Sequence, residues 1–494
     1  MSTAAVHAQQ QQQQQHNSLL WGAHGENWSP QSRLPDFSFA GYHFGEDPLP
    51  DIDITANVCD FGAIPDDDTD DTQAFKDAIA TTDHGAILIP AGRYIISDIL
   101  WIEKPNIVLR GQGAAKSILV CTKSLEDVRP NMSATTSGRP TSGYSWSGGF
   151  IWVKGNYRMT PVTPITSEST RGDRTVSVAD TEHIPLHQPI TITLHDDENK
   201  TLLNHLYTGD PGDTRKVTKP ITVRFVTRLT LIDGHGVTIE RPLRWDIRPE
   251  WKPEIRTFNP TVSEVGIEHL GFEFPNRPYK GHFTEFGANA IAINNAANCW
   301  VRNVRINNCD SGVFLTGMFC TIDNLVIESA RTPIGGTTGH HGVIMGTDNL
   351  MTNFTFNTHF IHDITVSYTH AGNVVKNGRG TNLSFDHHKK ANHENLFCNI
   401  DVGAGTEMWR CGGGASLGKH CGARTTFWCI RANRDQTWPR ASFGPDSMNL
   451  VGVRMAADTE SLTDPDSGKW IEPIPPNTLQ PADLHAAQLE RRLR

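Results

Sequence analysis

Side chains able to do chemistry gather most densely in the stretch 377–395. Imidazole, ammonium and guanidinium groups stand there beside carboxylates and amides, a mixture suited to proton transfer on an anionic ligand. The catalytic candidates are Asp386, His387, His388, Lys389 and His393, with Asp310 from further upstream. The substrate-binding candidates are His340, His341, Asn308, Asn377, Arg379, Asn395, Asp401, Arg410 and Arg424.

Two kinds of bond cleavage suit this cluster. In a β-elimination beside a carboxylate, a cation or amide neutralises that carboxylate, a neutral base such as His388 or His393 removes the adjacent proton, and an acid protonates the leaving oxygen. A locally basic groove would suit an acidic polymer. A glycoside hydrolase instead needs two carboxylates, roughly 5–9.5 Å apart. Asp310 paired with Asp386 or Asp401 could supply them.

A metal site and a purely structural role are the other interpretations of the cluster. Asp386, His387, His388 and His393 offer ligand types that Zn²⁺ accepts. Neighbouring side chains on a strand point to opposite faces, so His387 and His388 cannot both bind one ion, and we expect no tetrahedral zinc site. Turns between short strands also accumulate Asn, Asp and His, simply because these side chains form hydrogen bonds with backbone groups.

A repeated pattern between residues 288 and 432 must position these side chains. Each unit begins with a small residue and a short β-branched run, turns at Asn or Gly, and continues into a second run. The first-run residues Ile291, Val313, Val343 and Val374 are spaced by 22, 30 and 31 residues. Apolar residues alternate within each unit, which excludes helical repeats. A β-rich unit of this length predicts a parallel β-solenoid whose inserted loops gather on one face.

The segment 57–113 resembles a known family. Its matching runs are VCDFGAIPDDDTDDTQAFKDAI (58–79), ILIPAGRYIIS (87–97) and IVLRGQG (107–113). They resemble the start of the pectate-lyase-like right-handed β-helix superfamily, in its rhamnogalacturonase and pectate-lyase-3 branch. The resemblance implies an all-β, right-handed parallel β-helix in which the Asp-rich turn and the following helix cap the first coil. It also implies a polysaccharide substrate and keeps Ca²⁺ possible as a cofactor, as in the lyases that this chain resembles.

The remaining chain suggests an insertion and two distinct ends. Short alternating strands between about 160 and 255 predict a small β module inserted between coils, and Leu484, Leu489 and Leu493 form one stripe of a terminal helix. The predicted divisions are a low-complexity tail and irregular leader (1–50), first coils with the cap (51–158), a β-rich insertion (159–256), the main β-helix with the groove (257–455), and a tail with a short capping helix (456–494).

Composition and charge limit the partners. Of the 494 residues 37% are hydrophobic, with 43 Gly and 29 Pro, as in a turn-rich β protein. The net charge of −10 argues against nucleic acid as a partner, and no apolar run is long enough to span a membrane. Ala5-Val6-His7-Ala8 is similar to a signal cleavage site, so one hypothesis is a secreted protein. The alternative is an intracellular protein with a glutamine-rich tail.

We therefore predict a polysaccharide-cleaving enzyme, with β-elimination the first choice and hydrolysis the second. A non-catalytic glycan-binding solenoid is the alternative from a different class, because fold alone does not determine function.

Overall fold

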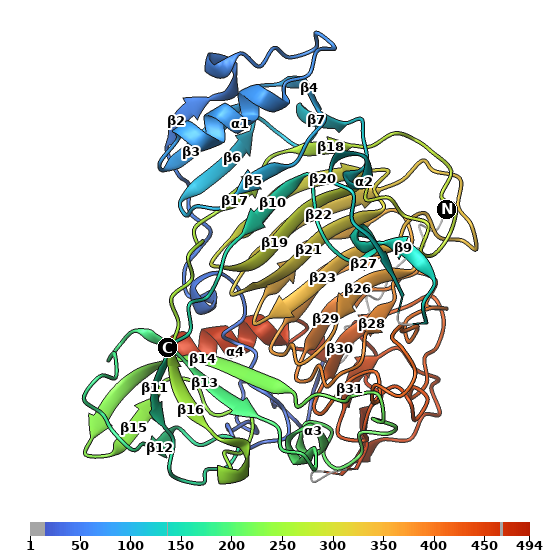
Figure 1. The fold of residues 1–494 in the computed structure, drawn as a ribbon. Coiled ribbons are helices and arrows are strands. Elements are labelled where there is room, and N and C mark those ends of the chain that lie inside the picture. The colour runs from blue at the N-terminus through green and yellow to red at the C-terminus, as the bar shows by residue number, and fades with distance from the viewer. Residues whose placement is uncertain (1–14, 136, 465–467) are drawn as a thin grey trace, which may run out of the picture.

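Two β-sheets, parallel except for one terminal strand pair, wind around one elongated core (Figure 1). The computed structural model describes residues 15–135, 137–464 and 468–494. The glutamine run and Ala5–Ala8 lie outside the described residues up to position 14. Successive coils stack as layers of these sheets, and the fold class is the parallel β-helix predicted from the repeats.

The shorter sheet has seven parallel strands. In sheet order they are β28 (Phe385–His387), β26 (His362–Val366), β23 (His341–Thr347), β21 (Ser311–Met318), β19 (Asn289–Ala297), β10 (Ile151–Lys154) and β5 (Leu100–Ile102). Ile291, Val313, Val343, Ile364 and Phe385 lie in register and point into the core. Alternate residues therefore point outward, where the functional candidates must be sought.

The longer sheet has 17 strands and forms the opposite wall. Its strands are β2 (Ile54–Asn57), β3 (Gly85–Ile89), β4 (Gly92–Ile96), β6 (Ile107–Gly111), β7 (Ser117–Cys121), β17 (Gly266–Glu268), β18 (Gly271–Glu273), β20 (Trp300–Asn307), β22 (Thr321–Glu328), β24 (Leu350–Thr352), β25 (Thr355–Phe356), β27 (Val374–Gly380), β29 (Leu396–Asp401), β30 (Thr426–Arg431), β31 (Asn449–Val453), β32 (Leu462–Thr463) and β33 (Trp470–Glu472).

The fourth unit of the sequence repeat belongs to the longer sheet, which corrects the repeat alignment. Val374 pairs with Leu350 and Leu396, whereas the partner of Val343 is Ile364. Both runs of a coil are short, β-branched and closed by Asn or Gly, so the sequence pattern does not distinguish the second run from the first.

All nine cysteines are free thiols.

An aspartate-rich turn leads into α1 (Thr72–Thr81), which packs on the first coils. Phe75, Ala78 and Ile79 join the main core from the apolar face of this helix. Asp71 accepts backbone N–H groups from Ile64 and Ile95, both at 2.9 Å. The turn therefore holds the helix against the coil, as the capping interpretation expects.

The inserted module is a six-stranded antiparallel sheet beside the β-helix. Its strands are β11 (Pro161–Pro164), β12 (Thr175–Ser177), β13 (Pro189–His195), β14 (Thr222–Asp233), β15 (Gly236–Ile239) and β16 (Glu254–Thr257), with the helix α3 (Thr201–His205). A bridge between Ile165 and Val178 joins its two edges, so the sheet closes on a core of its own. Two small pairs lie elsewhere: β8 (Met132–Ala134) with β9 (Pro140–Ser142), near the helix α2 (Leu125–Val128), and β1 (His16–Asn17) with β34 (Leu479–Gln480).

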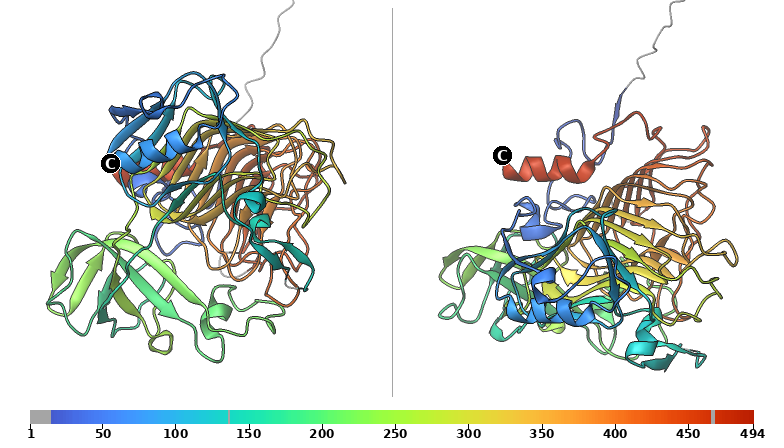
Figure 2. Two further views of the ribbon diagram at one scale, coloured as in Figure 1. Left: turned by 45° about the horizontal axis from the view of Figure 1, so that its top comes forward. Right: turned by 90° about the horizontal axis from the view of Figure 1, so that it is seen from above.

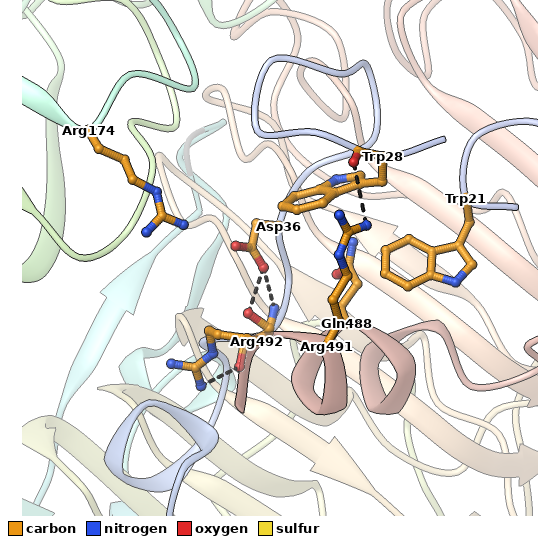
Figure 3. Close-up of a pocket in the computed structure, with 8 residues that line it drawn as sticks. Trp21, Trp28, Asp36, Arg174, Gln488, Arg491 and Arg492 are labelled. Atoms are coloured by element: carbon orange, nitrogen blue, oxygen red, sulfur yellow. Dashed lines mark hydrogen bonds between the residues drawn. The ribbon is translucent and has the colours of Figure 1, made fainter. Parts of the chain in front are cut away.

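The terminal helix α4 (Leu484–Leu493) does not cover the last coil. Figure 2 shows it beside the stack of strands, and Leu484 packs with Val374, Leu396 and Trp428 of three coils. A basic residue of α4 also contacts the irregular leader of the chain. The guanidinium of Arg491 lies between the rings of Trp21 and Trp28 (Figure 3), 5.8 and 5.3 Å from their centroids. The described part of the chain contains no helix long and apolar enough to cross a membrane.

Candidate functional site

A histidine and a buried aspartate form the centre of the site. Asp386 is the outward-facing residue of β28, and its Oδ2 accepts hydrogen bonds from His388 Nδ1 at 2.9 Å and Thr365 Oγ1 at 3.0 Å. Its Oδ1 accepts the backbone N–H of Gly412 at 2.6 Å. Burial alone would raise the pKa of Asp386, but His362, His388 and these hydrogen bonds hold it well below its usual range. The carboxylate is therefore charged and fixed in place.

His388 is the exposed member of this pair. Its side chain is 34% exposed, whereas that of Asp386 is fully buried. Burial lowers the pKa of His388, but the charge and hydrogen bond of Asp386 outweigh burial and raise it above the ordinary value. With Nδ1–H donated to Asp386, Nε2 is the ring nitrogen left to meet a ligand.

Four further histidines surround the pair. His282 Nε2 lies 3.0 Å from His340 Nε2, and His362 Nδ1 lies 3.3 Å from Asp386 Oδ2. His341 Nδ1 contacts Thr365 Oγ1 at 3.1 Å and so joins the network of the aspartate. Burial lowers the pKa of His282 and of His362 to about 4. Neutral imidazoles therefore line the site at neutral pH.

The structure brings together only part of the predicted set. Arg410 donates to the carbonyl oxygens of Phe360 and Ile361, just before His362, and its charge lowers the pKa of His362. Lys389 follows His388 along the chain, and its Nζ donates to Gly418 O at 3.2 Å. The predicted residues that meet at this site are His340, His341, Asp386, His388, Lys389 and Arg410.

Two predicted catalytic histidines lie elsewhere. His387 points inward, packs on Phe397 and Phe443, and contacts Asn392 Oδ1 at 2.7 Å. Strand alternation thus places it on the core side of β28, which excludes it from the outer face. His393 is also buried, and its Nε2 accepts a hydrogen bond from Trp245 of the inserted module at 3.0 Å.

Several other candidates have structural partners. Asp310 pairs with Arg331 at 2.6 Å and accepts two backbone N–H groups, and Asn308 Oδ1 accepts the N–H of Ala330. Arg424 pairs with Glu394 at 2.6 Å. Asn395 Oδ1 accepts from Asn373, inside a buried ladder of asparagines.

Asn377, Arg379 and Asp401 form a separate polar cleft. They lie on β27 and β29 of the longer sheet and line a cavity of about 470 Å³ together with Arg431. The histidines belong to the shorter sheet and its loops, so the structure divides the predicted binding residues between two walls.

Five residues of the site were not indicated by the sequence pattern: His282, His362, Thr365, Glu285 and Gly412. His341 and His362 are paired in register on neighbouring coils, so a coil period of 21 residues would have connected them. His282 lies in an irregular loop and gave no such signal.

The histidine-rich groups of this site do not suit the Ca²⁺ that the resemblance kept possible. Among the described residues, the groups of three potential metal ligands are His282 with His340 and His362, and His362 with Asp386 and His388. Calcium prefers a cage of oxygen atoms, whereas both groups are dominated by imidazole nitrogen.

Comparison with known proteins bears on the fold. Residues 55–160 match the family described as rhamnogalacturonase A/epimerase, pectate lyase-like. No curated protein sequence matches. The stacked parallel coils confirm the parallel β-helix, and the match of residues 55–160 agrees with the family resemblance seen in the segment 57–113.

Solved structures of similar fold come from several sources. The tailspike protein gp49 of Pseudomonas phage LKA1 is 12% identical with a TM-score of 0.40, covering 80% of this chain and 64% of that one. The exopolygalacturonase of Thermotoga maritima is 12% identical with a TM-score of 0.35, covering 86% and 80%. The alginate lyase of Paenibacillus sp. str. FPU-7 is 9% identical with a TM-score of 0.35, covering 84% and 95%. The chain thus spans less than two thirds of the tailspike, and identities this low leave its activity open.

Proposed function

We propose that this protein is a carbohydrate-active enzyme that cleaves an acidic, uronate-containing polysaccharide by β-elimination. The observation that carries the proposal is the pair of His388 and Asp386: a partly exposed imidazole held by a buried carboxylate on the outer face of the β-helix. The pectate-lyase-like match of residues 55–160 supports a glycan as the substrate.

The elimination assigns a role to each group. Asp386 orients the ring of His388, so that Nε2 removes the proton beside the sugar carboxylate. The Arg410 guanidinium, close enough to lower the pKa of His362, supplies positive charge for that carboxylate. Burial lowers the pKa of Lys389, which makes its ammonium a better donor to the departing oxygen. The bond to that oxygen then breaks as the carbon–carbon double bond forms.

Hydrolysis is the second candidate, and one observation favours it. Glu285 and Asp310 line the same cavity of about 230 Å³, and burial raises the pKa of Glu285 to about 7. A protonated carboxyl group beside a second carboxylate is the arrangement that glycoside hydrolysis requires. The tight pairing of Asp310 with Arg331 makes this candidate the weaker of the two.

The test is to treat a panel of uronate polymers with the purified full chain. Elimination yields products with a new ultraviolet absorbance and no label from ¹⁸O-water, whereas hydrolysis labels the new reducing end. We expect His388→Ala to lower turnover by about 10²–10⁴-fold, while His235→Ala, an exposed histidine of the module, leaves it unchanged. Glycan binding without any product would instead indicate a binding solenoid.

A further inference from the structure

We propose that His282, His340 and His362 form a binding site for a divalent transition metal, with Zn²⁺ the ion of best fit. One ring nitrogen of each residue lies within 4.8 Å of those of the other two. Nε2 of His282 and Nε2 of His340 are 3.0 Å apart. Two nitrogens bound to one metal at about 2.0–2.1 Å must lie at a similar separation.

The ligands come from three separate segments, which explains why the sequence indicated no such site. His340 precedes β23, His362 opens β26 on the next coil, and His282 lies in the loop before β19. The expectation of no zinc site considered only neighbours along one strand. In a β-helix, residues about one coil apart in sequence become neighbours in space, so the argument from neighbours on one strand does not apply to this group of histidines.

Two buried carboxyl groups stand behind the ligands. His340 Nδ1 lies 3.7 Å from Glu285 Oε2, and His362 Nδ1 lies 3.3 Å from Asp386 Oδ2. Both Nδ1 atoms are buried and have no hydrogen-bond partner. A carboxylate beyond a metal-binding histidine holds Nδ1–H and leaves Nε2 free for the ion. Neither Nδ1 makes a hydrogen bond in this structure, but Glu285 and Asp386 lie where they could accept these two Nδ1–H groups once the ion is bound through Nε2.

The donor set selects the class of ion. Three neutral imidazoles suit zinc and its neighbours in the first transition row, whereas calcium and magnesium prefer oxygen. Three protein ligands leave a fourth position for water or for a substrate oxygen. The ring of His362 lies 5.3 Å from that of His388, so the open position is close to the proposed base. Charge neutralisation of a uronate by the ion rests on the proposed function; binding of the ion does not.

The test measures Zn²⁺ binding to the chelator-treated full chain by calorimetry and elemental analysis, in the absence of any glycan. We expect one Zn²⁺ per chain and a dissociation constant raised more than about 100-fold in His282→Gln. We expect Glu285→Gln to raise it by roughly 10- to 100-fold, the usual effect of losing an outer partner. His388→Gln distinguishes this site from the group formed by His362, Asp386 and His388. This variant should bind Zn²⁺ with the affinity of the wild type, as should the control His235→Gln.

Part of His282 is exposed, so its replacement should leave the fold intact, and a thermal melt checks this. No Zn²⁺ binding by a folded chain, or binding that His282→Gln leaves unchanged, overturns the site. If His388→Gln loses Zn²⁺ binding and His282→Gln retains it, the ion belongs to the other group of ligands, and the proposed three-histidine site is overturned. A chain that binds Zn²⁺ but forms no unsaturated product retains the site and refutes the lyase.

Discussion

Gly412 shows how closely the residues of the candidate site are packed. Its N–H holds Asp386, and a Cβ added there would lie 2.5 Å from Cε1 of His388 and 2.6 Å from Cε1 of His362. The backbone at Gly412 does not adopt the left-handed conformation, so alanine is excluded by these two rings and not by strain. The first glycine of the run 412–414 thus leaves room for the histidines.

We predict that Gly412→Ala lowers turnover on a uronate polymer by at least about 10-fold, because displacing a catalytic group by even 1 Å can cost 10²-fold. The far-ultraviolet circular dichroism should stay that of the wild type, since the added methyl group meets side chains of the site and not the core. Full activity in a folded Gly412→Ala would mean that neither His388 nor His362 needs its present position.

Among single residues, the sequence indicated about half of the side chains that the structure brings together around Asp386. It singled out His340, Asp386 and His388 because their side chains are chemically capable and clustered along the chain. It wrongly added His387 and His393, since nearness in sequence says nothing about which wall of a coil a side chain faces. It missed His282 and His362, which reach the site only through the coil register.

At the scale of strands and turns, stacked asparagines link the turns of successive coils through hydrogen bonds. Asn373 Oδ1 accepts the N–H of Asn349, and its Nδ2 donates to Gly346 O at 2.6 Å and to Asn395 Oδ1 at 2.9 Å. These residues are buried, so each backbone group in the ladder depends on an amide side chain for its partner.

We predict that Asn373→Ala destabilises the protein by about 3 kcal/mol, because it leaves buried groups of Asn349 and Gly346 without partners. Asn357 is a matched control: it is exposed and makes a single side-chain bond to Glu328. Asn357→Ala should cost less than about 1 kcal/mol. Denaturant unfolding of both variants gives the comparison, and equal costs would contradict the proposed role of the ladder.

The elements themselves were largely predictable. Alternating apolar residues and Asn or Gly turns indicated the solenoid, and the Asp-rich run indicated α1. The register of β27 was not predictable, because both strands of a coil carry the same pattern. The position of α4 was also missed: its apolar stripe requires a hydrophobic partner, but the side of the coils and their end both offer one.

For the whole molecule, buried arginines join the inserted module to the β-helix. Arg241 and Arg244 of the module contact Asp348 at 2.9 and 2.6 Å. Glu394 receives Arg171 from the module at 3.2 Å and Arg424 from the β-helix. Glu394 belongs to the turn that follows His388, so this ionic cluster also supports the turn beside the candidate site.

A second contact supports the same turn. The hydroxyl of Tyr207, from the module, accepts the backbone N–H of Ala391 at 2.8 Å. Lys389, Lys390 and Ala391 all adopt positive φ, which costs free energy for residues other than glycine. The module thus holds a strained turn in place, and a single sequence cannot reveal this dependence because its partners lie about 180 residues apart.

The ionic cluster makes stability depend on pH in a defined direction. The neighbouring arginines outweigh burial and lower the pKa of Glu394 from 4.5 to about 2. A carboxyl group whose folded pKa is depressed stabilises the protein fully above its unfolded pKa and loses that contribution as pH falls. We therefore expect Glu394 to contribute on the order of 3 kcal/mol above pH 4.5, declining towards pH 2.

Thermal or denaturant unfolding of the wild type and of Glu394→Gln at a series of pH values tests this expectation. Glu394→Gln should be the less stable protein at pH 7, because the buried arginines lose their counter-charge. The difference between the two should shrink as pH falls from 4.5, since protonation removes the same charge from the wild type. Glu328→Gln is the control: that carboxylate pairs with the exposed Arg305, so the change should cost no more than about 1 kcal/mol. A difference between wild type and Glu394→Gln that stays constant down to pH 2 would mean that the charge of Glu394 does not join the module to the β-helix.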